Sequence, residues 1–179
     1  MGMLALLSFE PAEALAHDVE RFGSAGQVVI SSDAELSIGH INSDAGTVSA
    51  ARIVLAPGAD VFVTDGFSVG GRLLVGTEFA DSYSRQTLGL GPRIGYGLSL
   101  SERWSFHPTV GIAYETALRV DQVELIAAEL FAPLQVHPAE HFFVGFGPHV
   151  VHEIEKWTDG NEHDRYTTYE LRSVIGGYF

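Results

Sequence analysis

The amino-acid sequence predicts an all-β fold, an eight-stranded antiparallel up-and-down transmembrane β-barrel, on three observations. First, apolar residues alternate with polar or small ones along eight segments, and a period of two places successive side chains on opposite faces of a strand. Second, no run of about 18 apolar residues is present that could form a membrane helix. Third, the combined apolar face of eight strands is too large for the interior of a small barrel, so it fits against lipid.

Residues 88–100, the fourth predicted strand, show the alternation most clearly. One parity is apolar throughout and includes Ile94 and Leu98, whereas the other carries glycines, a serine and Arg93. We therefore expect the apolar parity to face lipid and Arg93 to face the lumen.

The first three predicted strands, residues 27–40, 50–63 and 67–79, follow the same rule. Their outward parity is apolar: Val28, Ile30, Ala34, Leu36 and Ile38, then Ile53, Leu55 and Val61, then Phe67, Val69, Leu73, Val75 and Phe79. Their inward parity carries charges: Asp33 and Glu35, then Arg52 and Asp60, then Arg72 and Glu78.

The last four predicted strands span residues 103–116, 122–136, 142–155 and 166–179. Strand six is the least regular, because residues 124–130 also fit a helix; its neighbours favour a strand. The outward residues of the other three are Trp104, Phe106, Val110, Ile112 and Tyr114, then Phe142, Val144, Phe146, Val150 and Ile154, then Tyr169, Leu171, Ile175 and Phe179. The inward parity of the four strands includes His107, Thr109 and Glu115, then Glu129, then His149, Glu153 and Glu155, then Glu170 and Arg172.

The connections between these strands alternate in length. Turn-forming residues occupy 64–66, 101–102 and 137–140. The connections at 41–49, 80–86, 117–121 and 156–165 are mostly longer and more polar. Short periplasmic turns and longer external loops are typical of bacterial barrels, and an even strand number places both termini on the short-turn side.

Four prolines are the best internal argument against this assignment. Pro57, Pro92, Pro108 and Pro148 lie inside predicted strands, where each removes a donor from the hydrogen-bond ladder. Local β-bulges could absorb them, yet the alternation continues on both sides of each proline.

Composition restricts the class of protein further. The 179 residues fit one domain, which we place at residues 27–179. The absence of cysteine excludes a disulfide framework and a thiolate metal site, and we expect no cofactor. A net charge of −13 argues against a nucleic-acid partner.

The N-terminal residues are predicted to be processed. Residues 1–16 contain a short apolar run at 3–7 and end in Ala14-Leu15-Ala16, which fits a signal-peptidase site before His17. No Lys or Arg precedes the run, so we interpret 1–16 as a truncated signal peptide. A short amphipathic helix is the alternative. Residues 17–26 are expected to be an N-terminal periplasmic segment.

The inward charges form the main candidate site. An eight-stranded barrel is just wide enough for its side chains to fill it, and an unpaired buried charge is very costly. We therefore predict a salt-bridged network that closes the lumen, with a narrow ion pathway or small binding cavity as the alternative. Its members are Asp33, Glu35, Arg52, Asp60, Arg72, Glu78, Arg93, Glu115, Glu129, Glu153, Glu155, Glu170 and Arg172.

Metal and catalytic sites are not expected. His107, His149 and Glu153 share the inward parity, but they lie on non-adjacent strands without a tight ligand motif. His152 and Ser173 share the outward parity of neighbouring strands, as a lipid-modifying barrel enzyme would require. Their predicted depths differ, which does not support a nucleophile–base pair.

Four segments carry a resemblance to a known family: residues 26–32 (GQVVISS), 90–96 (LGPRIGY), 141–148 (HFFVGFGP) and 175–179 (IGGYF). On these, residues 26–179 resemble the small outer-membrane β-barrel family that includes the OmpX- and OmpA-type barrels. The resemblance implies an integral protein of the Gram-negative outer membrane with a structural, adhesive or porin-like role, and it supplies no catalytic motif. Phe179 is similar to the terminal signal that the barrel-assembly machinery recognises, although the family often has an aromatic residue at the position of Gly177.

Two classes of function remain from the sequence. One is a closed barrel with a structural or surface-interaction role, whose loop at 157–165 contacts an unidentified extracellular ligand. The other is porin-like passive transport of small solutes, which strand number disfavours because aqueous channels need about 16–18 strands. We expect a monomer that contacts outer-membrane lipid and, during biogenesis, the barrel-assembly machinery. The candidates for an interfacial aromatic girdle are Trp104, Phe106, Tyr114 and Tyr169.

Overall fold

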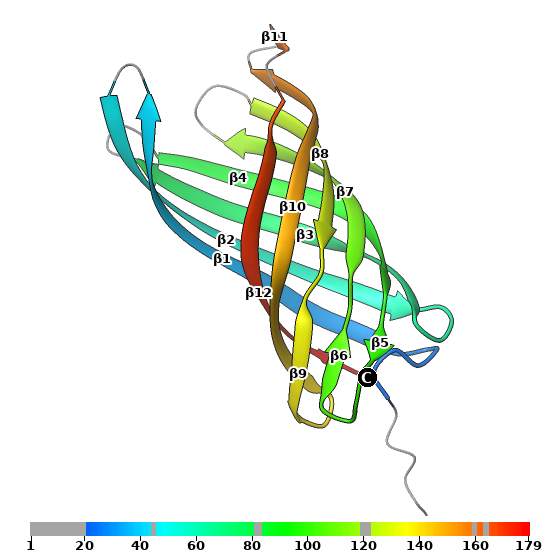
Figure 1. Cartoon of the computed structure of the whole chain (residues 1–179). Helices are drawn as coiled ribbons and strands as arrows, with labels where there is room; N and C mark the ends of the chain where they lie inside the picture. The colour runs from blue at the N-terminus through cyan, green and yellow to red at the C-terminus, as the bar shows by residue number, and fades with distance from the viewer. Residues whose placement is uncertain (1–20, 44–45, 81–83, 119–122, 159–160, 163–164) are drawn as a thin grey trace, which may run out of the picture.

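The structure is a computed structural model that describes residues 21–43, 46–80, 84–118, 123–158, 161–162 and 165–179. The strands β12, β1, β2, β3, β4, β7, β8 and β10 are antiparallel neighbours in that order, and β10 also pairs with β12, which closes the barrel (Figure 1). This confirms the predicted eight-stranded antiparallel barrel. The bounds are β1 Val28–Ser43, β2 Gly46–Phe62, β3 Phe67–Ala80, β4 Ser84–Tyr96, β5 Leu98–Ser99, β6 Trp104–Phe106, β7 Thr109–Leu118, β8 Val123–Phe131, β9 Leu134–Ala139, β10 Phe142–Thr158, β11 Asn161–Glu162 and β12 Thr167–Tyr178.

Three barrel strands are interrupted near the end that carries the short turns. β5 continues β4 after Gly97, β7 continues β6 after a break that contains Pro108, and β9 continues β8 after a break that contains Pro133. Residues 123–131 are a strand, which settles the ambiguous sixth segment in favour of β-structure. No described residue belongs to a helix long and apolar enough to cross a membrane.

The two ends of the barrel differ, as the loop pattern predicts. The turns at 63–66, 100–103 and 140–141 lie at the same end as Arg21 and Phe179, which we call the short-turn end (Figure 1). At the opposite end, the loop end, the strands run further than the sequence predicts. Most of the expected loop 41–49 is strand, because β1 and β2 keep pairing up to Ser43 and Gly46. Pairing between β1 and β2 depends on backbone hydrogen bonds, so it can continue beyond the part of the strands that faces lipid.

β1 leaves the barrel wall partway along its length. It pairs with β12 only from Val29 to Ala34 within the described residues, whereas its pairing with β2 continues to Ser43. The outer part of the β1–β2 hairpin therefore projects away from β12 (Figure 1).

The outer surface of the barrel is apolar and its interior is polar. Ile94 and Ile112 are 51% and 55% exposed, whereas Arg72 and Arg93 are 8% and 9% exposed. This inverts the distribution in a water-soluble protein and is the arrangement of a transmembrane barrel. The predicted outward parity of the fourth strand is therefore confirmed.

The prolines interrupt the ladders without changing their register. On either side of Pro92, Leu90 pairs with Tyr114 and Arg93 pairs with Gly111, so neither strand gains a residue. Register is equally constant across Pro57 and Pro148. The described strands thus contain no β-bulge at these prolines, because a proline removes one donor only and the flanking pairs hold the strands together.

A β-bulge does occur in β10, at a position without proline. The pairing of β10 with β8 shifts between Glu153 and Glu155, which leaves Ile154 as the extra residue. Beyond it the facing of the side chains reverses. Glu155, expected inward, is exposed opposite Ile126, and Lys156 turns inward instead to contact Glu153.

Candidate functional site

The lumen contains three successive groups of side chains. We name them from the short-turn end to the loop end. The aromatic plug is Phe22, Phe62, Phe143 and Tyr178 with His107 and His137; the central charge network is Asp33, Asp60, Arg72, Arg93, Glu129, Glu170 and Arg172 with His149; the outer cavity is lined by Arg52, Glu78, Arg85, Glu115, Glu153 and Lys156 together with smaller side chains.

Phe22 is the centre of the aromatic plug. Its ring centroid lies 5.4 Å from those of Phe62 and Tyr178 and 5.8 Å from that of Phe143. The His107 imidazole lies 5.5 Å away. Ring pairs with this edge-to-face geometry contribute about 0.5–1.5 kcal/mol each beyond the area they bury. The plug therefore fills the short-turn end with a small hydrophobic core.

Hydrogen bonds hold the chain before β1 inside this end of the barrel. The Gly66 amide donates to the Gly23 carbonyl at 2.7 Å, and the Gly23 amide donates to Oε1 of Gln27 at 2.9 Å. The Ala25 amide donates to the Asp65 carboxylate at 2.9 Å. The described part of the predicted periplasmic segment thus folds into the mouth of the barrel.

Arg93 and Asp60 form the best-defined pair of the central charge network. Nε and Nη2 of Arg93 donate to the two carboxylate oxygens of Asp60 at 2.9 and 2.5 Å, and Nη2 also donates to Ser31 at 3.2 Å. Fork-to-fork pairs of this kind are among the strongest hydrogen bonds in proteins. A Cβ at Gly58 would lie 2.8 Å from Nη2 of Arg93, so the glycine leaves the space that the guanidinium occupies.

A second arginine extends the network across the lumen. Arg72 forms an ion pair with Glu129, and its Nη1 lies 3.7 Å from Oδ2 of Asp33. The same oxygen lies 3.8 Å from Nη1 of Arg93. Asp33 thus lies between the two guanidiniums and connects β1 with β3 and β4.

Arg172 and His149 share one carboxylate on the other side of the lumen. Nη2 of Arg172 lies 2.7 Å from Oε1 of Glu170, and Nδ1 of His149 lies 2.6 Å from the same oxygen. Each of the three side chains comes from β10 or β12. These contacts join β10 to β12, as the Arg72–Glu129 ion pair joins β3 to β8.

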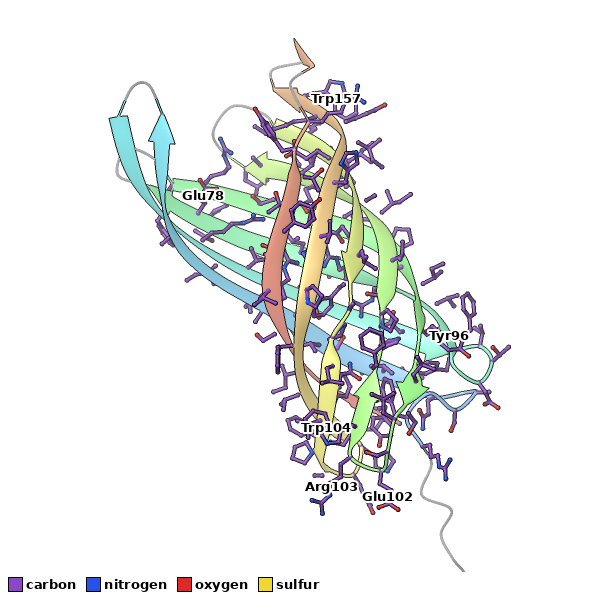
Figure 2. The ribbon with its side chains drawn as sticks, in the orientation of Figure 1. Glu78, Tyr96, Glu102, Arg103, Trp104 and Trp157 are labelled. Carbon is purple, nitrogen blue, oxygen red and sulfur yellow. The ribbon has the colours of Figure 1, made fainter. Side chains whose placement is uncertain are left out.

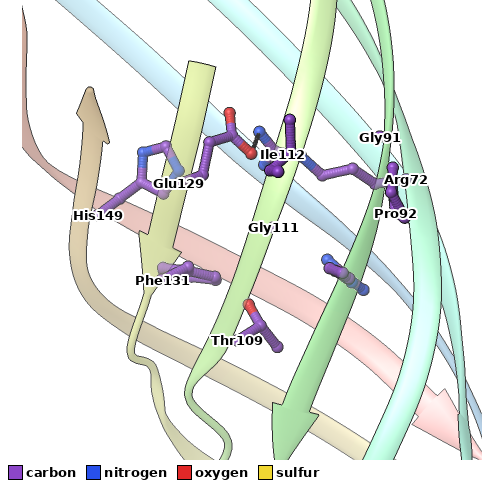
Figure 3. Close-up of a pocket in the computed structure, with 10 residues that line it drawn as sticks. Arg72, Gly91, Pro92, Thr109, Gly111, Ile112, Glu129, Phe131 and His149 are labelled. Atoms are coloured by element: carbon purple, nitrogen blue, oxygen red, sulfur yellow. Dashed lines mark ion pairs between the residues drawn. The ribbon is translucent and has the colours of Figure 1, made fainter. Parts of the chain in front are cut away.

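The space left within the central charge network is small. A void of about 10 Å³ lies among Arg72, Glu129, Phe131 and His149 (Figure 3). Such a volume holds about one water molecule. No solute larger than water fits here without rearrangement.

The outer cavity is larger, with a volume of about 130 Å³. Six strands contribute to it, and its smaller lining residues are Gly76, Thr77, Thr87, Thr116, Ala117, Val123 and Leu125. Four residues predicted for the charge network, Arg52, Glu78, Glu115 and Glu153, line this cavity rather than the central network. The Glu35 side chain lies outside the described residues.

The predicted girdle residues lie toward the two ends of the barrel. Trp104 and Phe106 are in β6 at the short-turn end, where Figure 2 labels Trp104. Tyr114 and Tyr169 lie on the loop-end parts of β7 and β12 and are 40% and 77% exposed. Phe179 is exposed, and its backbone exchanges two hydrogen bonds with Val28, which attaches the C-terminus to the first strand.

The residues considered for catalysis are not brought together. His152 bonds to the Thr167 hydroxyl at 2.9 Å, and the Ser173 hydroxyl donates to the Ala34 carbonyl at 3.1 Å. Among the described residues, no group of three or more His, Cys, Asp or Glu side chains is placed to hold a metal ion.

Sequence reasoning missed Phe22 and a buried polar chain beside it. Phe22 precedes the first strand, so no alternation marks it; the signal was a lone aromatic next to a glycine. Ser105 donates to Oε1 of Gln135 at 2.8 Å and lies 2.7 Å from Nε2 of His137. Ser105 and Gln135 have the inward parity of their strands, which could have indicated them.

Solved structures provide an independent comparison of the fold. Neisserial surface protein A (NspA) is similar with a TM-score of 0.58 at 10% identity, over 88% of this chain and 99% of that one. The outer membrane protein OprG from Pseudomonas aeruginosa is similar with a TM-score of 0.51 at 11% identity, over 87% of this chain and 97% of that one. No protein-family model and no curated protein matches the chain. With its apolar outer surface, the chain has the fold of a small integral outer-membrane β-barrel.

Proposed function

We propose that this protein is a closed barrel of the Gram-negative outer membrane that acts at the cell surface, in a structural or surface-interaction role. The observation that carries the proposal is the central charge network. Its arginines and carboxylates come from strands all around the barrel and meet in the middle of the lumen.

Two obstacles in series support a closed lumen. A solute would have to displace the buried Phe22 ring at the short-turn end and then separate the Arg93–Asp60 pair. Separating a buried ion pair leaves both charges without a partner, which typically costs about 3–5 kcal/mol.

The length of the strands supports a role at the surface. β1, β2 and β10 contain 16, 17 and 17 residues, whereas about 9–11 tilted residues cross a bilayer. The additional residues lie at the loop end, where they form a β-structured surface outside the membrane. A partner would meet this surface rather than a pore.

Conductance separates this proposal from porin-like transport. The full chain, refolded into planar bilayers, is expected to give no steady single-channel current, and liposomes that contain it should not swell in small sugars or amino acids. Liposomes without protein set the baseline. A large, steady conductance of the wild-type protein would favour passive transport and contradict the proposal.

A further inference from the structure

The outer cavity is a blind chamber that opens toward the loop end. Along β7, Glu115 lies four residues closer to the loop end than Gly111, which pairs with Glu129 of the central charge network. The network therefore forms the base beneath the cavity. A ligand that enters the cavity would come from outside the cell and would have no route onward.

The two walls of the cavity carry opposite net charge. On the β2–β3–β4 wall, Glu78 is the cross-strand neighbour of Arg52 on one side and of Arg85 on the other, so this wall carries two arginines and one carboxylate. On the opposite wall, Lys156 neutralises Glu153 at 3.2 Å, which leaves the Glu115 charge in excess. One positive and one negative charge therefore face each other across the cavity.

Glu115 is the carboxylate that carries the excess negative charge of the cavity. It is 7% exposed and lines the cavity, yet no described residue forms a hydrogen bond or ion pair with its carboxylate. Arg52, on the opposite wall, is the cation whose charge acts most strongly on it. A buried carboxylate without a hydrogen-bonded partner is costly, so Glu115 favours a ligand that supplies a cationic donor.

The β-bulge in β10 is the structural reason for this distribution. If β10 alternated regularly through Ile154, Lys156 would face outward and Glu155 would face the lumen. Glu153 would then be uncompensated, and the cavity would contain one carboxylate more. The bulge thus turns an acidic chamber into a dipolar one.

We propose that the outer cavity binds a small zwitterion, with its ammonium group on Glu115 and its carboxylate on Arg52. The volume of about 130 Å³ is more than ten times that of the void in the central charge network, which suits a molecule of a few heavy atoms. Ala117, Val123 and Leu125 supply a small apolar surface for a short side chain. The inference goes beyond the closed-barrel function and does not require any solute to cross the membrane.

A ligand series on the wild-type protein tests the proposal without any mutation. L-alanine, acetate and methylammonium are titrated separately into the refolded full chain at constant ionic strength, and binding is followed by the NMR chemical shifts of residues around the cavity. We expect alanine to bind at least about tenfold more tightly than either singly charged analogue, since each charge-assisted contact is lost in one of them. Equal affinities for the three compounds, or no binding of alanine, would overturn the proposal.

Neutral variants then locate the two contacts. Glu115→Gln and Arg52→Gln should each weaken alanine binding about tenfold or more. The matched controls are Glu155→Gln, a carboxylate on the outer face of the same wall, and Arg103→Gln at the short-turn end, and both should bind as the wild type does. If Glu155→Gln weakened binding as much as Glu115→Gln, the site would not be the cavity. Bilayer conductance is measured separately. A conducting wild type would contradict the closed-barrel function, whereas absence of alanine binding would contradict only the cavity proposal.

Discussion

The central and outer parts of the lumen contain the same types of charged residue, but these residues have different roles in the two parts. Arg93 lies in the centre with both carboxylate oxygens of Asp60 bound, whereas Arg52 lies in the wall of a cavity of about 130 Å³ and has no hydrogen bond or ion pair to another described residue. In the centre, charges pair because there is space for only about one water molecule. Toward the loop end, space and solvent allow charges to remain available.

Strand pairing follows the same division. β1 pairs with β12 near the short-turn end but, among the described residues, only with β2 beyond Ala34. The short-turn half is closed both laterally, by β1–β12 pairing, and axially, by the aromatic plug. The loop-end half is open enough to hold a cavity. The short-turn half thus contributes most to stability, and the loop-end half has the space for binding.

The largest expected effect breaks the central charge network. Arg93→Ala should lower the free energy of unfolding by about 3–5 kcal/mol, because Asp60 would remain buried without its partner. Urea unfolding of the refolded barrel in detergent measures this. Arg103→Ala, at an exposed turn, is the matched control and should unfold as the wild type does. If the Arg93→Ala protein were as stable as the wild type, the central charges would contribute no more to stability than those of the outer cavity, and the comparison would be wrong.

The aromatic plug is tested by Phe22→Ala. Loss of a buried phenylalanine ring should lower the free energy of unfolding by about 3 kcal/mol, since five aromatic or imidazole rings surround it. Phe22→Leu retains most of the apolar volume and should lose less than about 1.5 kcal/mol. Equal stability of the wild type and Phe22→Ala would mean that residues 21–27 only cover the barrel.

The lipid-facing surface is tested by Ile94→Arg. A charge toward hydrocarbon should destabilise the barrel in bilayers by about 2 kcal/mol if Ile94 is near the midplane. Leu100→Arg, on the same outer parity but beside the short turn, should cost about 0–1 kcal/mol. If the two variants were equally stable, the depth assigned to β4 would be incorrect.

The smallest effect is expected in the outer cavity. Arg52→Ala should change the free energy of unfolding by about 0–1 kcal/mol, as for partly solvated charges. The same urea titration compares it directly with Arg93→Ala. A cost as large as that of Arg93→Ala would show that the cavity is as tightly paired as the centre.

Alternation was enough to predict the fold, and it also indicated the facing of most side chains. In β4, buried and exposed residues alternate without interruption around Arg93, so the period of two residues correctly predicted that Arg93 faces the lumen. The facing of Glu155 could not be found in this way, because a single inserted residue reverses parity and Ile154 carries no mark of a bulge. Residues 124–130 in β8 were ambiguous because they fit both a helical and a strand period, and only pairing with β7 and β10 decides between the two.

The sequence alone could not predict which of the inward charged side chains form pairs. Parity predicts only that Arg52 and Arg93 both face the lumen, although their depth in the barrel and their partners differ. Depth depends on strand tilt and on the register between strands, neither of which alternation encodes. The position of Phe22 could not be predicted for a related reason, since a segment that folds back into the barrel follows no strand period.

The in-strand prolines have a consequence for the chain before it reaches the membrane. An unfolded barrel protein exposes long apolar strands in water, and such segments tend to stack into cross-β aggregates. Pro57, Pro92, Pro108, Pro133 and Pro148 place a residue without an amide donor in five of the eight barrel strands. Because the folded register tolerates each of them, these prolines disfavour cross-β stacking of the unfolded chain at little cost to the finished barrel.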